Sequence, residues 1–235
     1  MEIREFFKDR ECYEGENGIL CLGDARDLIK RVPDGYVDHV ITDPPWGVGQ
    51  DEYDDGNLIY EIEDEMWRVL KGSAWMVFFS TPKYILRVRE FRKFEYVWMI
   101  PYLFWSFGSV SRNPLGSQSS YSVVVVMRKG KPKVVHRRKD VIVSDELPVV
   151  KGNVKEPQFK PTYAVATLLT MFTREGDVVL DPFAGYGSIP LVCEVFGRKW
   201  IGFEIDPLKF RIAKQILKEK RVSDISRMKR ELATL

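Results

Sequence analysis

Long apolar runs and cysteines are both scarce in this sequence of 235 residues. No stretch approaches the roughly 20 apolar residues that a membrane-spanning helix needs. The first residues, Met1 to Lys8, are charged and lack the apolar core of a secretion signal. These absences predict a soluble cytoplasmic protein with no membrane partner.

The cysteines, Cys12, Cys21 and Cys193, show no Cys-x-x-Cys spacing. We therefore expect neither a disulfide framework nor a zinc or other metal site. Cys21 and Cys193 lie in apolar runs, which is typical of buried core cysteines. There are only two histidines. We expect His39 to pack in the core, and His136, within a basic segment, to contact phosphate.

Amides are also rare, with four asparagines and four glutamines, whereas charged residues make up 30% of the chain. Many ion-pairing residues with few heat-labile amides indicate a thermophilic source. The net charge is only +2, but its distribution is uneven. Acidic residues crowd positions 51–65, and basic residues crowd positions 128–139 and 209–230. This asymmetry favours a surface that meets phosphate.

Apolar patterning predicts strands that alternate with helices. Expected strands cover residues 18–22, 37–42, 74–79, 96–104, 121–127, 177–180 and 199–203, with 96–104 and 121–127 paired. Expected helices cover 58–70, 82–91, 162–173, 189–196 and 207–220, and residues 134–150 could add a small hairpin. This alternation predicts an α/β fold with a doubly wound, mostly parallel sheet and a ligand at the carboxyl ends of its strands. We expect one domain over residues 1–235, with an inserted segment at 104–159.

A glycine-bearing turn follows one of these strands in Val178-Val-Leu-Asp-Pro-Phe-Ala-Gly-Tyr-Gly-Ser188. Gly185 and Gly187 permit a tight turn and the close approach of a ligand. Glu204 ends the next strand, where a carboxylate can accept hydrogen bonds from ribose hydroxyls. Together they suit a ligand that carries ribose hydroxyls; a purely structural glycine turn and a helix-flanking charge at Glu204 are the alternatives.

A second motif, Asp43-Pro44-Pro45-Trp46, follows an expected strand. Consecutive prolines cannot donate ladder hydrogen bonds, so the chain leaves the sheet there. The stiff turn fixes the Asp43 carboxylate, the Pro44 carbonyl and the Trp46 ring. Two acceptors beside an aromatic face suit a planar base that carries an amino group; an ordinary Pro-Pro turn with a buried tryptophan is the alternative.

With both motifs, the sequence resembles the S-adenosylmethionine-dependent amino-methyltransferases that modify adenine N6 or cytosine N4. The order, with Asp-Pro-Pro-Trp before the glycine-rich turn, is similar to the permuted, or β, arrangement of that family. The resemblance implies one circularly permuted, Rossmann-like class I methyltransferase domain whose inserted segment recognises the substrate. It also implies S-adenosylmethionine as the cofactor.

The resemblance also implies roles for single residues. The cofactor residues would be Asp24, Lys160, Asp181, Phe183, Gly185, Gly187 and Glu204, and the catalytic residues Asp43, Pro44, Pro45 and Trp46. Tyr186 departs from the family, in which serine or threonine is common at this position; it either fills space or shapes the substrate entrance.

The expected chemistry needs neither a metal nor a covalent intermediate. Asp43 and the Pro44 carbonyl would accept hydrogen bonds from the amino group and stabilise the positive charge that develops on its nitrogen. Trp46 would stack on the target base once that base has left the stacked nucleic acid. Methylation at carbon 5 would need a cysteine nucleophile, and none of the cysteines lies in a catalytic-looking loop.

The substrate is predicted to be a nucleic acid. The candidate contacts are Arg112, Arg128, Lys129, Lys131, Lys133, Arg137, Arg138 and Lys139, although a solvated basic hairpin is an alternative reading. The insert is short for reading several DNA base pairs, which favours structured RNA. The chain also looks similar to archaeal enzymes that methylate cytidine N4 in ribosomal RNA. Structured, ribosomal RNA is therefore expected ahead of DNA, with cytidine N4 as the expected target.

Three alternatives remain. One is a DNA adenine-N6 or cytosine-N4 methyltransferase, since Asp at the first motif position is commoner in adenine-N6 DNA enzymes. The second is a glutamine-methylating enzyme, whose motif carries Asn in place of Asp43. The third is a noncatalytic nucleic-acid-binding module, which would not need Asp43, Gly185, Gly187 or Glu204.

Overall fold

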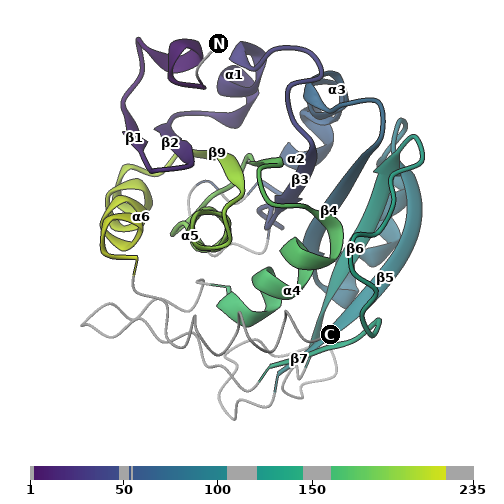
Figure 1. Cartoon of the computed structure of the whole chain (residues 1–235). Helices are drawn as coiled ribbons and strands as arrows, with labels where there is room; N and C mark the ends of the chain where they lie inside the picture. Colours follow the sequence, from purple (N-terminus) through teal and green to yellow (C-terminus); the bar gives the residue numbers. More distant parts are fainter. Residues whose placement is uncertain (1–2, 48–52, 54, 105–120, 145–159, 221–235) are drawn as a thin grey trace.

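The computed structural model describes residues 3–47, 53, 55–104, 121–144 and 160–220. Within these ranges nine strands form one sheet in the order β1-β2-β9-β8-β3-β4-β6-β5-β7. The strands are β1 (Cys12–Glu14), β2 (Gly18–Leu22), β3 (His39–Thr42), β4 (Ala74–Ser80), β5 (Glu95–Phe104), β6 (Tyr121–Lys129), β7 (Ile142–Ser144), β8 (Val178–Asp181) and β9 (Lys199–Glu204). In Figure 1 the sheet extends from β1 and β2 on the left to β5 and β6 on the right.

The centre of the sheet is parallel. β2, β9, β8, β3 and β4 run in the same direction, and β6 then pairs antiparallel with both β4 and β5. The predicted pairing of residues 96–104 with 121–127 is therefore confirmed. The doubly wound, mostly parallel sheet expected from the alternating pattern is also confirmed.

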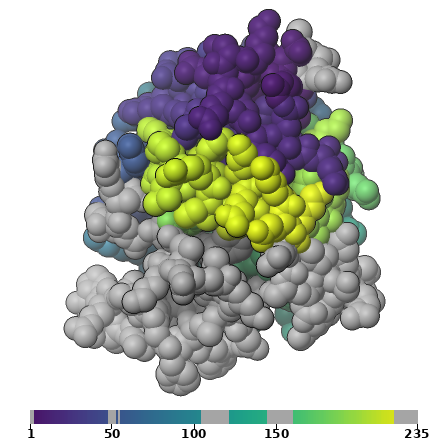
Figure 2. Space-filling view, turned by 90° about the vertical axis from the view of Figure 1, so that its left-hand side faces the viewer, coloured from purple at the N-terminus to yellow at the C-terminus, as the bar shows by residue number. Residues whose placement is uncertain are grey.

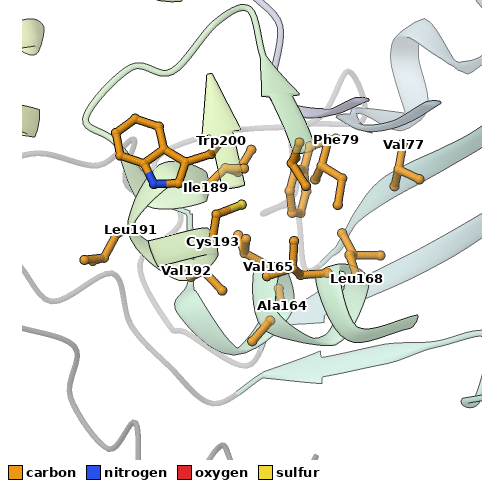
Figure 3. Packing of buried hydrophobic residues seen from close by; sticks show 14 of the residues in the cluster. Val77, Phe79, Ala164, Val165, Leu168, Ile189, Leu191, Val192, Cys193 and Trp200 are labelled. Carbon is orange, nitrogen blue, oxygen red and sulfur yellow. The ribbon is translucent and has the colours of Figure 1, made fainter. Parts of the chain in front are cut away.

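Helices cover both faces of this sheet. They are η1 (Ile3–Phe7), α1 (Ala25–Leu28), η2 (Ile29–Arg31), α2 (Leu58–Glu61), α3 (Glu63–Val69), η3 (Pro82–Glu90), α4 (Thr162–Phe172), α5 (Ser188–Val195) and α6 (Pro207–Glu219). Every residue of β4 is buried, because Val77 and Phe79 face the core under α4, α5 and α6 while Met76 and Phe78 face the core under α1 and α3. Figure 3 shows α4 and α5 packed on the first of these cores.

The α6 side of the molecule holds the N-terminal part of the chain. Figure 2 shows the N-terminal residues and α6 side by side on this face. Lys220, at the end of α6, lies 2.6 Å from the Glu16 carboxylate in the β1–β2 turn. The buried Glu194 carboxylate accepts hydrogen bonds from the Glu16 N–H at 2.7 Å and from the Trp200 indole at 2.6 Å. These contacts hold the β1–β2 turn against α5 and the end of α6.

One sequence expectation about the cysteines is wrong. Cys12 and Cys21 form a disulfide. They are directly opposite each other in the antiparallel β1–β2 pair, where side chains lie close enough to be bridged. β1 has only three residues, too few for a periodic signal, so the sequence did not reveal the pairing. Cys193 is a buried free thiol, as expected.

Other local expectations differ from the structure. The helix expected over 82–91 is present as a 3-10 helix, Pro82–Glu90, but no hairpin forms in the described part of 134–150. Instead, β7 pairs in parallel with β5, and the N–H groups of Val135 and His136 donate to the carbonyl of Met171 at the end of α4. Within the expected insert, β6 lies in the main sheet. Among the described residues, no helix is long and apolar enough to cross a membrane.

Candidate functional site

The predicted acidic residues gather at the carboxyl edge of the parallel strands. Asp24 follows β2, Asp43 follows β3, and Asp181 and Glu204 end β8 and β9. The N–H of Gly23 donates a 2.8 Å hydrogen bond to the carbonyl of Glu204 and so links the ends of β2 and β9. Carboxyl ends of parallel strands share one edge of a sheet, so residues distant in sequence form one candidate site.

The Asp43 carboxylate pairs with Lys160, which precedes α4. Lys160 Nζ lies 3.0 Å from Asp43 Oδ2, and the two side chains are 28% and 26% exposed. Burial raises the pKa of Asp43, while Lys160 and a hydrogen bond from the Trp46 side chain oppose this rise. Lys160, expected in the cofactor pocket by resemblance, thus contacts the expected catalytic carboxylate directly.

Asp181 is buried at the end of β8, next to β3, the strand that leads into Asp43. The hydroxyl of Thr42, at the end of β3, donates a 2.7 Å hydrogen bond to Asp181 Oδ1. Burial raises the pKa of Asp181 to about 7, and the nearby carboxylates of Asp43 and Glu204 add to the rise. Thr42 did not stand out in the sequence, because a threonine at the end of a strand is an ordinary β-former.

The Glu204 carboxylate organises the glycine-rich turn. Its Oε2 accepts a 2.7 Å hydrogen bond from the Gly185 N–H, and its Oε1 accepts one of 2.7 Å from the Asp206 N–H. Burial is the main cause of its raised pKa. Each carboxylate oxygen has two lone pairs, so one acceptor position on each remains for a ligand hydroxyl.

The turn itself leaves room for a ligand. Gly185 and Gly187 have φ values of 54° and 82°, which residues other than glycine rarely adopt. A methyl group at Gly187 would lie 3.1 Å from the Ala213 Cβ, whereas one at Gly185 would meet nothing within 4 Å. The Phe183 N–H donates to Asp181 Oδ1 at 3.3 Å. Open space beside a glycine turn and buried carboxylates fits a ligand with hydroxyl groups and positive charge, such as S-adenosylmethionine.

Trp46 lies in a row of aromatic rings. Its ring centroid is 6.1 Å from that of Phe78 and 5.8 Å from that of Tyr84, with interplanar angles of 28° and 15°. Phe78 is buried in β4, and Pro44 is also buried. Tyr84, in η3, was missed because residues 82–91 read only as a helix. The base-stacking role expected for Trp46 therefore has a second aromatic beside it.

Asp24 is already engaged within the fold. It caps α1 by accepting a 2.8 Å hydrogen bond from the Arg26 N–H, and its Oδ2 lies 2.6 Å from the Arg26 guanidinium. These interactions lower the pKa of Asp24. The expected contact with the cofactor adenine stays a prediction.

Tyr186 packs close to Lys209, and its two expected roles stay predictions. Its side chain is largely buried, and Lys209 Nζ lies 5.9 Å from its ring centroid. His39 is likewise buried, as expected, and its Nδ1 accepts a hydrogen bond from the Trp75 N–H. Among the described residues, no group of His, Cys, Asp and Glu side chains could hold a metal ion.

Two of the predicted nucleic-acid contacts are used inside the fold. Arg128 pairs with Glu95 at 2.6 Å, and Lys129 Nζ donates to the carbonyls of Trp67 and Leu70 at 2.5 and 2.7 Å. Both residues lie opposite the amino end of β4, whereas Asp43 lies at the carboxyl edge. The structure therefore does not bring Arg128 and Lys129 to the candidate site.

The rest of the basic segment lies beside the end of α4. A hollow there is lined by Lys133, Val134, Arg137, Arg138 and Met171. Burial lowers the pKa of Arg138. Lys131 and Lys139 are exposed neighbours of this hollow in sequence, and Arg112 lies outside the described residues. Phosphate binding by this segment stays a prediction.

Comparison with protein families identifies the chain. The family model described as DNA methylase, for N6 and N4 methyltransferases, matches residues 37–215. The chain belongs to this family. Its members are S-adenosylmethionine-dependent amino-methyltransferases, so the enzyme class and cofactor implied by the two motifs are confirmed.

Known relatives and structures agree with this assignment. The chain is similar to the type II methyltransferase M.BamHI of Bacillus amyloliquefaciens, at 31% identity over 86% of the chain, and spans 57% of that protein's length. It is also similar to the putative methylase YubD of Escherichia coli, at 27% identity over 78% of the chain and 82% of that protein.

Solved structures show the same fold at low sequence identity. A complex of M1.HpyAVI with S-adenosylmethionine matches with a TM-score of 0.68 and 23% identity, over 84% of this chain and 98% of that one. The cytosine-N4-specific PvuII DNA methyltransferase matches with a TM-score of 0.68 and 18% identity, over 94% and 93% of the two chains. The predicted class I methyltransferase fold is therefore confirmed.

Proposed function

We propose that this protein transfers the methyl group of S-adenosylmethionine to the exocyclic amino nitrogen of a base in DNA. The observation that carries the proposal is the adjacency of the Asp43 turn on β3 and the Asp181 turn on β8, joined by the 2.7 Å bond from Thr42 to Asp181. An acceptor for an amino group thus lies beside a turn that suits the cofactor.

The preference for DNA rests on the comparisons. The matching family is described as DNA methylase, and M.BamHI is a type II methyltransferase. The RNA preference expected from the short insert gains no support from them. DNA, kept as the alternative in the sequence analysis, is therefore the better-supported substrate class.

Asp43 is the central residue of the proposed chemistry. An aromatic amino group is a weak nucleophile, and acceptors on its N–H groups stabilise the positive charge that forms on nitrogen. Asp43 can accept one such bond while Lys160 holds its Oδ2 atom. The Pro44 carbonyl is the proposed second acceptor. When bound, S-adenosylmethionine supplies a methyl group on a positively charged sulfur.

The direct test is nucleoside analysis after incubation with the cofactor. Purified protein would be incubated with S-adenosylmethionine and unmethylated DNA, and in parallel with unmodified ribosomal RNA. Mass spectrometry of the nucleosides would distinguish N4-methylcytosine from N6-methyladenine, with Asp43→Ala as the inactive control. We expect methylated DNA; methylation of RNA alone would overturn the substrate proposal, and methylation of neither would overturn the proposed activity.

A further inference from the structure

The segment after β4 forms an unusual helix at the edge of the candidate site. Asp43 follows Thr42, which is paired with Phe78, and η3 begins two residues after the end of β4. η3 is a nine-residue 3-10 helix, whereas 3-10 runs longer than three or four residues are uncommon. In this helix, residues three apart in sequence lie on the same face. The sequence Pro82-Lys-Tyr-Ile-Leu-Arg-Val-Arg-Glu90 therefore forms three ridges.

The inner ridge attaches η3 to the core. Ile85 and Val88 pack against the buried cluster that contains Phe78, and Phe91, next in this series, is 8% exposed. This ridge accounts for the apolar residues of the segment except Tyr84 and Leu86. It leaves the other two ridges to face the site and the solvent.

The middle ridge fixes η3 beside the Asp-Pro-Pro-Trp motif. Tyr84 stacks on Trp46, and Arg87 donates to the Gly56 carbonyl and to Asn57 Oδ1, both at 2.8 Å. The Arg87 guanidinium also lies 4.6 Å from the ring centroid of Tyr60 and pairs with Glu90 at 2.7 Å. These contacts fix the position of η3 relative to Trp46, because they reach both Trp46 itself and the Gly56–Asn57 segment.

The outer ridge consists of Lys83, Leu86 and Arg89, all exposed. Leu86 is 72% exposed, the largest value among the large apolar side chains of the described residues. Lys83 Nζ lies 5.0 Å from the Tyr84 ring centroid, and neither Lys83 nor Arg89 forms an ion pair within the described part of the chain. At about 2 Å of rise per residue, they lie roughly 12 Å apart along the helix axis. The ridge thus presents two cations with an apolar side chain between them.

We propose that this outer ridge binds the strand of DNA next to the target base. Lys83 and Arg89 would contact phosphates, and Leu86 would pack on the sugar and base surface uncovered when the target base leaves its stack. The proposal rests on the proposed function and adds a substrate surface to it. Continuity with Trp46 through Tyr84 and charge complementarity to phosphate favour DNA as the occupant.

The position of η3 distinguishes it from the basic segment at 128–139. Arg128 and Lys129 are engaged by the fold and lie opposite the amino end of β4. η3 follows the carboxyl end of β4, on the same edge as Asp43. Cations that hold the strand beside a reacting base must lie on that edge.

The test compares two double variants in which charges are neutralised. The variant with Lys83→Gln and Arg89→Gln removes the proposed contacts. The control, with Arg211→Gln and Lys218→Gln, removes two exposed cations from α6, which lies against β2. DNA affinity would be measured at several salt concentrations, with S-adenosylmethionine affinity and melting temperature as folding controls. Loss of two phosphate contacts should reduce the slope of log affinity against log salt by roughly 2. The α6 pair should keep the wild-type slope.

Leu86→Ala supplies an independent measurement. We expect a higher KM for DNA and an unchanged KM for S-adenosylmethionine. A wild-type salt slope in the Lys83 and Arg89 variant, an equal loss in the α6 variant, or a loss seen instead on neutralising Lys131 and Lys133 would each overturn the inference. These results leave the proposed function intact, whereas a wild-type protein that methylates no DNA defeats the proposed function itself.

Discussion

Lys160 Nζ lies 3.0 Å from Asp43 Oδ2 and so joins the residue after β3 to the segment that leads into α4. Lys160 also lies over the Phe79 ring, at 5.4 Å from its centroid. The ammonium group stabilises the ionised form of a carboxylate whose pKa burial would otherwise raise further. Lys160 is therefore a positioning residue for Asp43 as well as a candidate cofactor contact.

Replacing Lys160 by Met should move the pH dependence of methyl transfer. Without the ammonium, the pKa of Asp43 rises, so the ionised acceptor is lost at a higher pH. We expect the acidic limb of the kcat profile to shift to higher pH. Lys160→Arg keeps the charge and should restore most of the profile. An unshifted limb in Lys160→Met would contradict the role of the ion pair.

Replacing Asp43 should lower the chemical rate more than cofactor binding. The variant Asp43→Ala removes the acceptor for the amino group, and loss of comparable transition-state stabilisers costs a factor on the order of 10²–10³. Single-turnover transfer to DNA, with cofactor affinity measured by calorimetry, separates the two effects. Near-normal transfer by Asp43→Ala would remove the basis for the proposed active site.

Replacing Glu204 should lower the affinity for S-adenosylmethionine and loosen the glycine-rich turn. Glu204→Ala removes the acceptor for the Gly185 and Asp206 N–H groups together with the proposed ribose contact. Hydrogen bonds to a charged group contribute about 1.5–3 kcal/mol, so affinity for S-adenosylmethionine should fall roughly 10- to 100-fold. Glu204→Gln, which keeps one oxygen acceptor, should lose less. Equal affinities in the wild type and Glu204→Ala would speak against this site.

Cofactor affinity should depend on pH through Asp181. Its pKa is about 7 in the protein alone, and a bound cation favours the ionised carboxylate. Below pH 7, binding must therefore release the Asp181 proton, and affinity should fall by up to about tenfold per pH unit as the pH decreases. Calorimetric titrations across neutral pH would measure this slope. Asp181→Asn cannot ionise and should flatten it; an equally steep slope in that variant would assign the effect to another group.

Reduction of the Cys12–Cys21 disulfide should destabilise the protein. The bond closes a loop with a sequence separation of 9, for which the chain-entropy model gives about 3 kcal/mol. In a chain of this size, that corresponds to a melting temperature lower by roughly 5–10 °C. Thermal unfolding with and without reductant, with Cys193→Ser as the control that keeps the disulfide, measures this. A melting temperature indifferent to reductant would show that the bond contributes no stability.

The sequence by itself determined the elements that carry the site. Residues 18–22 form β2 as predicted, and the predicted strand and helix on either side of the glycine turn correspond to β8 and α5. These elements read clearly because apolar periodicity and Gly or Pro punctuation are local signals. The order of the Asp43 and Gly185 motifs also led directly to the family.

The tertiary structure alone decided which side chains meet. The pairings of Asp43 with Lys160, Asp181 with Thr42 and Cys12 with Cys21 join residues from different elements. The structure also shows that Arg128 and Lys129 are engaged by the fold, whereas Lys83 and Arg89 are exposed on η3. The sequence pattern alone did not reveal this difference. The reason is physical: periodicity reports which face of an element is buried, but strand order and register decide which buried or exposed groups lie within hydrogen-bonding distance.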